Sequence, residues 1–314
     1  MEPKDLSDRL RCENRQESLL PEGVRVNVPK VASAHRPQTK PKLGQHFLDS
    51  EDAAARIVGA LGDISQSTVL EIGPGRGILT SLLAKRARRL IAVELDRVLA
   101  AQLRLKFGMS RNVEVIEADV LSIDFESLFG PKPGLGRPGI EVKPEPVKVV
   151  GNLPYYITSD ILLRLFEFSK YFESIVIMVQ KEVADRIAAK PGGSDYGILS
   201  ATAQLNARVE NLFTLPPGDF APSPKVHSSV LRLTIDPQQE KLGVAGDGFI
   251  AFLRLSFGQK RKTLWNNLKE KYEEAGLKRA LAEAKVRPTA RAETLSLEES
   301  AAVFRALRNA QGES

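Results

Sequence analysis

The alternation of short apolar runs with helical patterns, from about residue 50 to residue 235, most constrains the fold of this chain. Short apolar runs bounded by glycine or polar residues are typical of buried strands, and alternation of apolar and polar residues, as at 227–235, is typical of half-buried ones. We expect strands at 68–72, 90–93, 113–116, 147–150, 174–179, 207–213 and 227–235. Strands that alternate with helices favour an α/β fold with a mostly parallel sheet covered by helices on both faces.

The helical patterns divide the chain into regions. Between the expected strands, apolar residues recur at helical spacing, and after residue 238 only helical patterns remain. The expected helices are 49–61, 78–87, 98–107, 158–169, 181–189, 197–206, 249–257, 262–275, 277–284 and 297–307. The prolines and glycines of 130–146 predict a surface loop. We therefore expect a flexible tail at 1–38, an α/β domain at 39–238 and a small all-helical domain at 239–314.

Composition limits the class of protein. One cysteine among 314 residues excludes an internal disulfide, and with three histidines it argues against a zinc site, so we expect no metal. No apolar run is long enough to span a membrane, and the first residues lack both a signal core and a transit-peptide composition. We expect a cytoplasmic protein without membrane contact. The net charge of +6 suits a polyanionic partner, although solubility alone also explains it.

Three of the expected strands end in residues that suit an adenosyl ligand. The first ends in a glycine-rich turn with Gly73, Gly75 and Gly77, where Ile78 replaces the third glycine of a dinucleotide-binding turn. Glu94 ends the second strand and can accept hydrogen bonds from ribose hydroxyls, and Asp119 follows the third and can accept one from an adenine amino group. Each acid alone is equally explained as a solvated strand-end or turn residue. Together they predict an adenosyl cofactor without a pyrophosphate.

The most specific motif is Asn152-Leu153-Pro154-Tyr155, after the fourth strand. The amino group of adenine is a poor nucleophile, because its lone pair is delocalised into the ring. Acceptors from the Asn152 side chain and a nearby carbonyl, such as that of Leu153, favour a pyramidal nitrogen. Pro154 fixes the loop, and Tyr155 can stack on an extruded base. The alternative is a polar turn with a rigid proline and a buried tyrosine.

These motifs resemble the ribosomal RNA adenine dimethylase family, which includes the small-subunit dimethylases and the erythromycin-resistance methylases. The matching stretches are 43–48, 71–75, 93–96, 117–119, 151–155, 178–182, 220–226 and 258–264. The resemblance implies a Rossmann-like S-adenosylmethionine methyltransferase domain. It also implies that His46 and Leu48 line the cofactor pocket with the strand-end residues, and that Phe220 offers the base a second aromatic face. His46 and Tyr156 stand where asparagine is common in the family.

A basic cluster follows the α/β region. From Phe249 to Lys269 there is no acid, and Trp265 lies among the cations. The candidate RNA-binding residues are Arg254, Lys260, Arg261 and Lys262, with Lys225 nearer the base-entry side. A solvated helix face with Trp265 in the core explains the cluster equally well. In the resembled family this stretch and the helical domain hold structured rRNA.

The resemblance implies dimethylation of the N6 amino groups of two adjacent adenosines in the 3′-terminal hairpin loop of 16S rRNA. The partner would be the 30S subunit or its precursor, with a role in subunit biogenesis and a monomeric enzyme. A DNA adenine methyltransferase is disfavoured, because its Asp/Asn-Pro-Pro-Tyr/Phe motif and a sequence-reading domain are absent from the sequence. The alternative of another class is a non-catalytic ribosome-assembly or transcription factor with the same fold.

Overall fold

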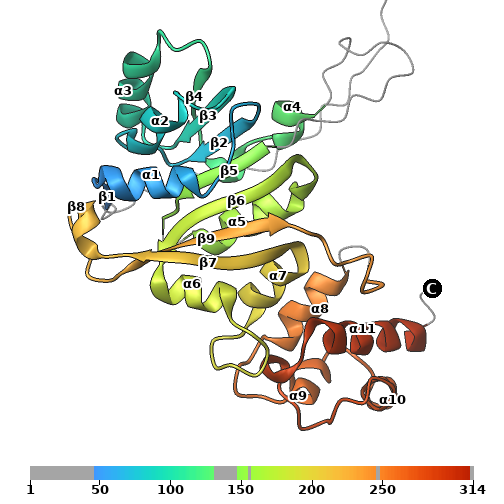
Figure 1. Cartoon of the computed structure of the whole chain (residues 1–314). Helices are drawn as coiled ribbons and strands as arrows, with labels where there is room; N and C mark the ends of the chain where they lie inside the picture. Colours follow the sequence, from blue (N-terminus) through green and yellow to red (C-terminus); the bar gives the residue numbers. More distant parts are fainter. Residues whose placement is uncertain (1–45, 131–146, 155–156, 245–247, 312–314) are drawn as a thin grey trace, which may run out of the picture. The chain divides into compact units, whose positions relative to one another are not determined.

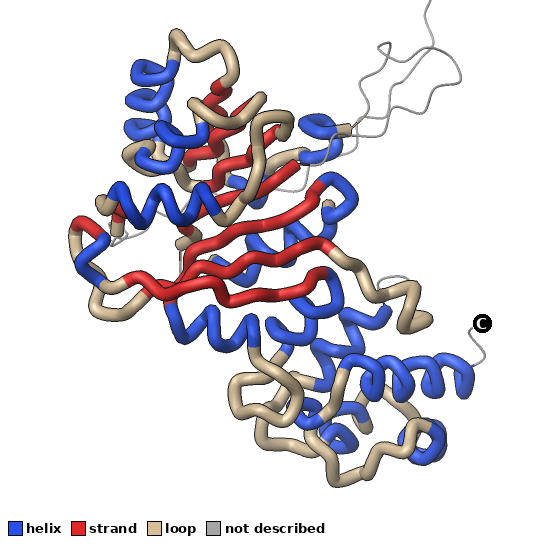
Figure 2. The backbone as a smooth tube through the Cα atoms, viewed as in Figure 1, coloured by secondary structure: helices blue, strands red, loops and turns tan. Residues whose placement is uncertain are grey.

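A seven-stranded sheet forms the centre of the protein in the computed structural model, which describes residues 46–130, 147–154, 157–244 and 248–311 (Figures 1 and 2). The strand order is β4-β3-β2-β5-β6-β9-β7. The strands are β2 (Thr68–Ile72), β3 (Arg89–Glu94), β4 (Val113–Glu117), β5 (Val147–Asn152), β6 (Phe172–Gln180), β7 (Ala207–Leu215) and β9 (Ser228–Ile235). The pairs from β4 to β6 are parallel, whereas β9 runs antiparallel to β6 and β7. The predicted α/β class and mostly parallel sheet are confirmed.

Helices cover both faces of this sheet, as expected. The helices of this region are α1 (Glu51–Gly59), α2 (Ile78–Leu83), α3 (Arg97–Phe107), α4 (Phe125–Phe129), α5 (Thr158–Glu167), α6 (Lys181–Ala188) and α7 (Ile198–Asn206). Apolar residues of α1 and α2 pack on one set of strand side chains, including Val69 and Val150. Residues of α4, α5 and α6 pack with the alternate set, including Leu70 and Val149. Because successive strand side chains point to opposite faces, strands buried on both sides are apolar throughout.

The last part of the chain is helical and packs around a second apolar cluster. It contains α8 (Gly248–Ser256), α9 (Leu264–Leu268), α10 (Glu274–Glu283) and α11 (Leu297–Gln311). The rings of Phe249, Phe252 and Phe304 meet at its centre, with centroids 5.3–6.0 Å apart. Tyr196 and Leu205, which belong to the α/β part, pack into the same cluster, so the helical end is fixed to α7 through shared apolar contacts.

Three of the expected helices were wrong in extent, and the one expected at 297–307 continues to Gln311. The helix expected at 262–275 is broken after Leu268, although that stretch contains no proline and its only candidate breaker is local polarity. The chain turns there because Leu264 and Leu268 of α9 and Leu277 of α10 all face the same core. The helix expected at 78–87 ends at Leu83, before the turn that leads into β3. Tertiary packing overrides local helical preference in such short segments.

A short strand pair was not expected from the sequence. β1 (Phe47–Leu48) pairs antiparallel with β8 (Phe220–Ala221), joining two motifs that lie far apart in the chain. Two-residue strands are too short to show a periodic pattern. The expected tail at 1–38, and all but the first residue of the expected loop at 130–146, lie outside the described residues.

Two kinds of feature are missing from the described residues, namely membrane-spanning helices and clusters of metal-ligating side chains. None of the helices there has the length and apolarity needed to cross a membrane. Within the same ranges, no group of three or more histidine, cysteine, aspartate or glutamate side chains is placed to hold a metal ion.

Candidate active site at the carboxyl ends of the strands

The glycine-rich turn between β2 and α2 forms the floor of the candidate cofactor site. Gly73, Gly75 and Gly77 have φ values of 67°, 57° and 81°, in the left-handed region that disfavours other residues. A Cβ atom on Gly75 would lie 2.9 Å from Cδ1 of Phe47. A side chain at Gly75 would therefore meet the Phe47 ring of β1, so only glycine lets this ring pack against the turn.

Glu94 ties the glycine turn to the end of β3. Its carboxylate is 5% exposed; Oε2 accepts a hydrogen bond from the Gly75 N–H at 3.0 Å, and Oε1 accepts one from the Asp96 N–H at 2.9 Å. A carboxylate has about four acceptor sites, so two further hydrogen bonds remain available. The predicted ribose-binding acid thus lies directly beside the predicted glycine turn, with its orientation fixed by backbone donors.

Glu71 is a residue that the sequence interpretation did not single out. It lies in β2, is 1% exposed, and neither carboxyl oxygen has a hydrogen-bond partner among the described residues. Burial, followed by the nearby charge of Glu94, raises the pKa of Glu71 to about 8. The buried Thr80 hydroxyl lies close enough to offset part of this rise but outside hydrogen-bond geometry. The sequence feature that could have pointed to Glu71 is the presence of an acidic residue inside an otherwise apolar strand.

Asn152 is the last residue of β5, next to the end of β2. Its Nδ2 donates a hydrogen bond to the backbone carbonyl of His46 at 3.2 Å, which fixes the amide and leaves Oδ1 as an acceptor. Leu153 is buried and its N–H donates to the Met178 carbonyl at 3.1 Å. Pro154 is exposed. Tyr155 and Tyr156 lie outside the described residues, so the predicted stacking residue has no structural account.

The β1–β8 pair brings the N-terminal motif to the side of the sheet formed by the carboxyl ends of its parallel strands, here termed the sheet edge. The ring Nδ1 of His46 lies 2.7 Å from the Pro222 carbonyl, so His46 bridges Asn152 and the segment after β8. Leu48 pairs with Phe220, and both side chains are buried in one apolar cluster. The Phe220 ring is 4% exposed, so it packs beneath this edge of the site and presents little open surface.

Asp119 follows β4, whose end lies beside the end of β3 in parallel register. Its Oδ1 accepts a hydrogen bond from the Leu121 N–H at 3.0 Å and so caps a short 3-10 turn at Val120–Ser122. The turn-capping interpretation is therefore observed. It leaves the other carboxylate oxygen without a partner among the described residues, so adenine recognition by Asp119 stays a prediction.

The candidate RNA-binding cations occupy two places. Lys225 is exposed in the connection from β8 to β9, whereas the other four lie in and after α8 (Figure 1). The Lys260 ammonium donates to the Ser194 carbonyl at 2.7 Å, which holds it against the loop before α7. Arg254, Arg261 and Lys262 are exposed, and their side chains make no hydrogen bond or ion pair within the described ranges. Trp265 is half-buried against the helical core.

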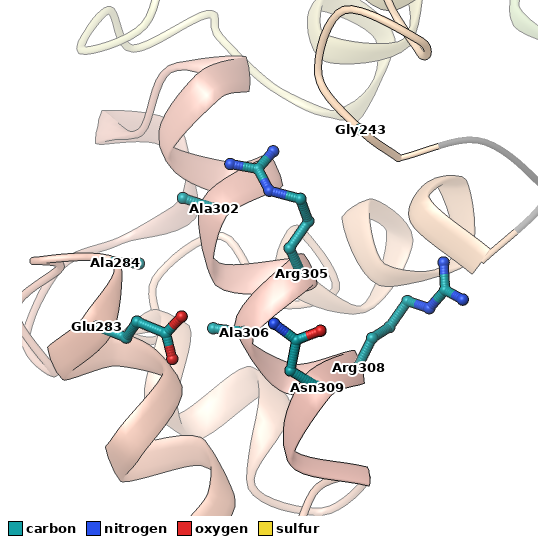
Figure 3. A pocket seen from close by; sticks show the side chains of 8 residues that line it. All are labelled: Gly243, Glu283, Ala284, Ala302, Arg305, Ala306, Arg308 and Asn309. Atoms are coloured by element: carbon teal, nitrogen blue, oxygen red, sulfur yellow. The ribbon is translucent and has the colours of Figure 1, made fainter. Parts of the chain in front are cut away.

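A surface cavity of about 400 Å³ lies at the helical end rather than at the sheet edge (Figure 3). It is lined by Gly243, Glu283, Ala284, Ala302, Arg305, Ala306, Arg308 and Asn309. The cavity combines one acid with two guanidinium groups, and a guanidinium N–H of Arg305 donates to the Leu242 carbonyl. Neither the glycine turn between β2 and α2 nor the carboxyl end of a parallel strand contributes to it, so it is not the site of the predicted chemistry.

Comparison with known proteins bears directly on this arrangement. Residues 36–309 match the family model for ribosomal RNA adenine dimethylase. The chain is 56% identical over 283 residues to the ribosomal RNA small subunit methyltransferase A of Koribacter versatilis, covering 90% of this chain and 99% of that protein. It is 54% identical over 271 residues to the Acidobacterium capsulatum protein of the same name, covering 86% and 92%.

Solved structures give the same fold. A dimethyladenosine transferase from Plasmodium falciparum superposes with a TM-score of 0.67 at 24% identity, covering 85% of this chain and 98% of that one. The 23S rRNA methyltransferase ErmE superposes with a TM-score of 0.59 at 28% identity, covering 83% and 99%. The Rossmann-like methyltransferase fold is confirmed. Since the family model spans most of the chain and its relatives are matched over almost their full length, this chain belongs to the ribosomal RNA adenine dimethylase family.

Proposed function

We propose that this chain transfers methyl groups from S-adenosylmethionine to the N6 amino groups of two adjacent adenosines in the 3′-terminal hairpin loop of small-subunit rRNA. The observation that carries the proposal is the fixed amide of Asn152 at the end of β5, next to the glycine turn and Glu94. The names of the relatives from Koribacter versatilis and Acidobacterium capsulatum support a small-subunit substrate.

The residues at the strand ends fit an adenosyl cofactor. The three turn glycines have positive φ values, which lets the backbone of the turn face a ligand closely, and Glu94 has acceptor sites left after its two backbone hydrogen bonds. Leu48, Gly73, Gly77 and Asp119 complete the proposed pocket, with His46 holding Asn152. When bound, S-adenosylmethionine supplies an activated methyl group on a sulfonium sulfur, so the protein needs to provide positioning and electrostatics.

Asn152 and Leu153 provide the proposed acceptors for the adenine amino group. Because His46 already takes up Nδ2 of Asn152, the amide presents Oδ1 in one orientation. Two oxygen acceptors favour a pyramidal amine whose lone pair points away from the ring. Pro154 limits the loop's motion, and the proton leaves after transfer, when the nitrogen is cationic and acidic. Tyr155 is the proposed aromatic contact for the base, whereas Phe220, with its ring 4% exposed, can offer a second one only if the segment around β8 moves.

The proposed organisation assigns catalysis to residues 39–238 and RNA binding to 239–314, with a tail at 1–38. Exposed cations at Arg254, Arg261 and Lys262 support contacts to phosphates. We propose that the enzyme acts as a monomer in the cytoplasm on the 30S subunit or its precursor and contributes to subunit biogenesis. Lys260 would add a contact within the basic cluster, and Lys225 would add one nearer the base-entry side.

Methyl transfer from labelled S-adenosylmethionine to unmethylated small subunits tests the function. We expect label in the rRNA, recovered as N6,N6-dimethyladenosine after digestion and mass spectrometry. Tight subunit binding without label would instead support a non-catalytic assembly factor. Label in DNA or in large-subunit rRNA alone would contradict the proposed substrate.

A further inference from the structure

The outward face of α3 carries an apolar stripe that none of the described residues covers. Of the five large hydrophobic side chains that are exposed among the described residues, four belong to residues 95–109. Leu95 directly follows Glu94, a residue of the proposed cofactor pocket, and is left out of the stripe. Val98, Leu105 and Met109 are 65%, 87% and 97% exposed and lie away from that pocket along the helix.

These three side chains share one line on the helix surface. A helix advances ~100° per residue, so Val98, Leu105 and Met109 fall within a sector of about 40°, with Met109 just beyond the last residue of α3. The opposite face buries Ala100, Leu103 and Phe107. The helix is therefore apolar on two faces, whereas a helix that only covers a core needs one.

Positive charges border the stripe on both sides. By the same geometry, Arg97 and Arg104 flank one side and Lys106 flanks the other, and residues 97–113 contain no acid. Arg104 is paired with Glu117 at 3.0 Å, and the Lys106 ammonium lies 5.3 Å from the centre of the Phe107 ring. Arg97 and Arg111 make no ion pair within the described ranges, so the border retains net positive charge.

We propose that this face of α3 binds an amphipathic helix of another protein, with an apolar stripe bordered by aspartate and glutamate. An apolar stripe of this kind fits the apolar face of a partner helix, and methionine adapts well to such surfaces. An RNA backbone satisfies the arginines but offers nothing to Leu105 and Met109. A second copy of the chain would bring cations against cations.

Synthetic helical peptides test the surface on the full-length protein. The probe is a fluorescent peptide with leucines at helical spacing bordered by glutamates, and its twins carry lysine for glutamate or serine for leucine. Fluorescence anisotropy should show micromolar binding of the acidic leucine peptide and at least about tenfold weaker binding of both twins. Equal binding of the lysine twin, or no binding of the acidic peptide, would overturn the proposal.

Variants locate the binding on α3. Leu105→Asp and Met109→Asp, both at exposed positions, should each weaken peptide binding about tenfold, and Arg97→Glu should weaken it and reduce its salt dependence. Ala275→Asp on the exposed face of α10 is the matched control and should change nothing. Cofactor binding and thermal melting report folding of each variant.

A photoreactive benzoylphenylalanine at position 105, introduced into the full chain in cells, identifies the natural partner. We expect a crosslink to a protein, and we expect the crosslinked site to lie in an acidic amphipathic segment. Adding Arg97→Glu should abolish this crosslink. A crosslink to RNA, or to a protein segment without acidic residues, would overturn it.

Discussion

The sheet edge and the helical end both present charged side chains, but they hold them in different ways. Glu71 and Glu94 at the sheet edge are 1% and 5% exposed, and backbone donors fix Glu94 in place. At the helical end, Arg261 and Lys262 are exposed and make no ion pair in the described part of the chain. Buried polar groups depend on geometry, whereas exposed cations act through charge that solvent and salt screen. Single substitutions should therefore have large effects at the edge and small, additive effects at the helical end.

The largest effect is expected from Asn152→Ala. Removing an acceptor aimed at the reacting amine should lower kcat by about 100-fold or more, with RNA affinity within about twofold of the unchanged protein. Single-turnover methyl transfer and filter binding measure the two quantities. Asn309→Ala, which removes an exposed amide on α11, is the control. Unchanged turnover in Asn152→Ala would remove the proposed role of this side chain.

Gly75→Ala should weaken the binding of S-adenosylmethionine. The new methyl group would lie 2.9 Å from the Phe47 ring at a residue with φ of 57°, so the turn has to shift away from Glu94. We expect an affinity for S-adenosylmethionine roughly 10- to 100-fold weaker by calorimetry. Gly62→Ala carries similar backbone strain, with φ of 71° and no atom within 4 Å, and should leave cofactor affinity unchanged. Equal losses in both variants would mean that general strain, and not crowding at the site, is responsible.

The sequence predicted the fold well because buried parallel strands appear as continuous apolar runs. It predicted that the glycine turn and Glu94 lie together because the carboxyl ends of parallel strands lie on the same side of the sheet. It did not predict that Asn152 is held by the His46 carbonyl, since that contact depends on the two-residue strands β1 and β8. The break after Leu268 was also missed, because a core shared by α9 and α10 determines it, and no local breaker marks it.

Glu71 makes the sheet edge sensitive to pH. Its pKa of about 8 in the folded protein lies above the ordinary value of 4.5, so the folded state binds the extra proton between these values. Stability should therefore fall as pH rises from about 5 to about 8, and level off above that. Glu71→Gln should remove this slope and raise the melting temperature near pH 8 by several degrees, measured by calorimetry. A pH dependence equal to that of the exposed control Glu283→Gln would contradict the buried, protonated state.

The smallest effect is expected from single cations at the helical end. Lys262→Ala should weaken binding to small-subunit RNA only a few-fold and reduce the slope of log affinity against log salt by about 1, because one phosphate contact is lost. Lys260→Ala should do the same while also freeing the loop that its ammonium holds through the Ser194 carbonyl. Lys278→Ala on α10 is a charge-matched control outside the basic cluster. Filter binding across a salt series separates these cases. An unchanged slope in Lys262→Ala would show that this cation is only solvated. A loss of RNA affinity as large as the loss of turnover in Asn152→Ala would contradict the distinction between fixed and screened charges.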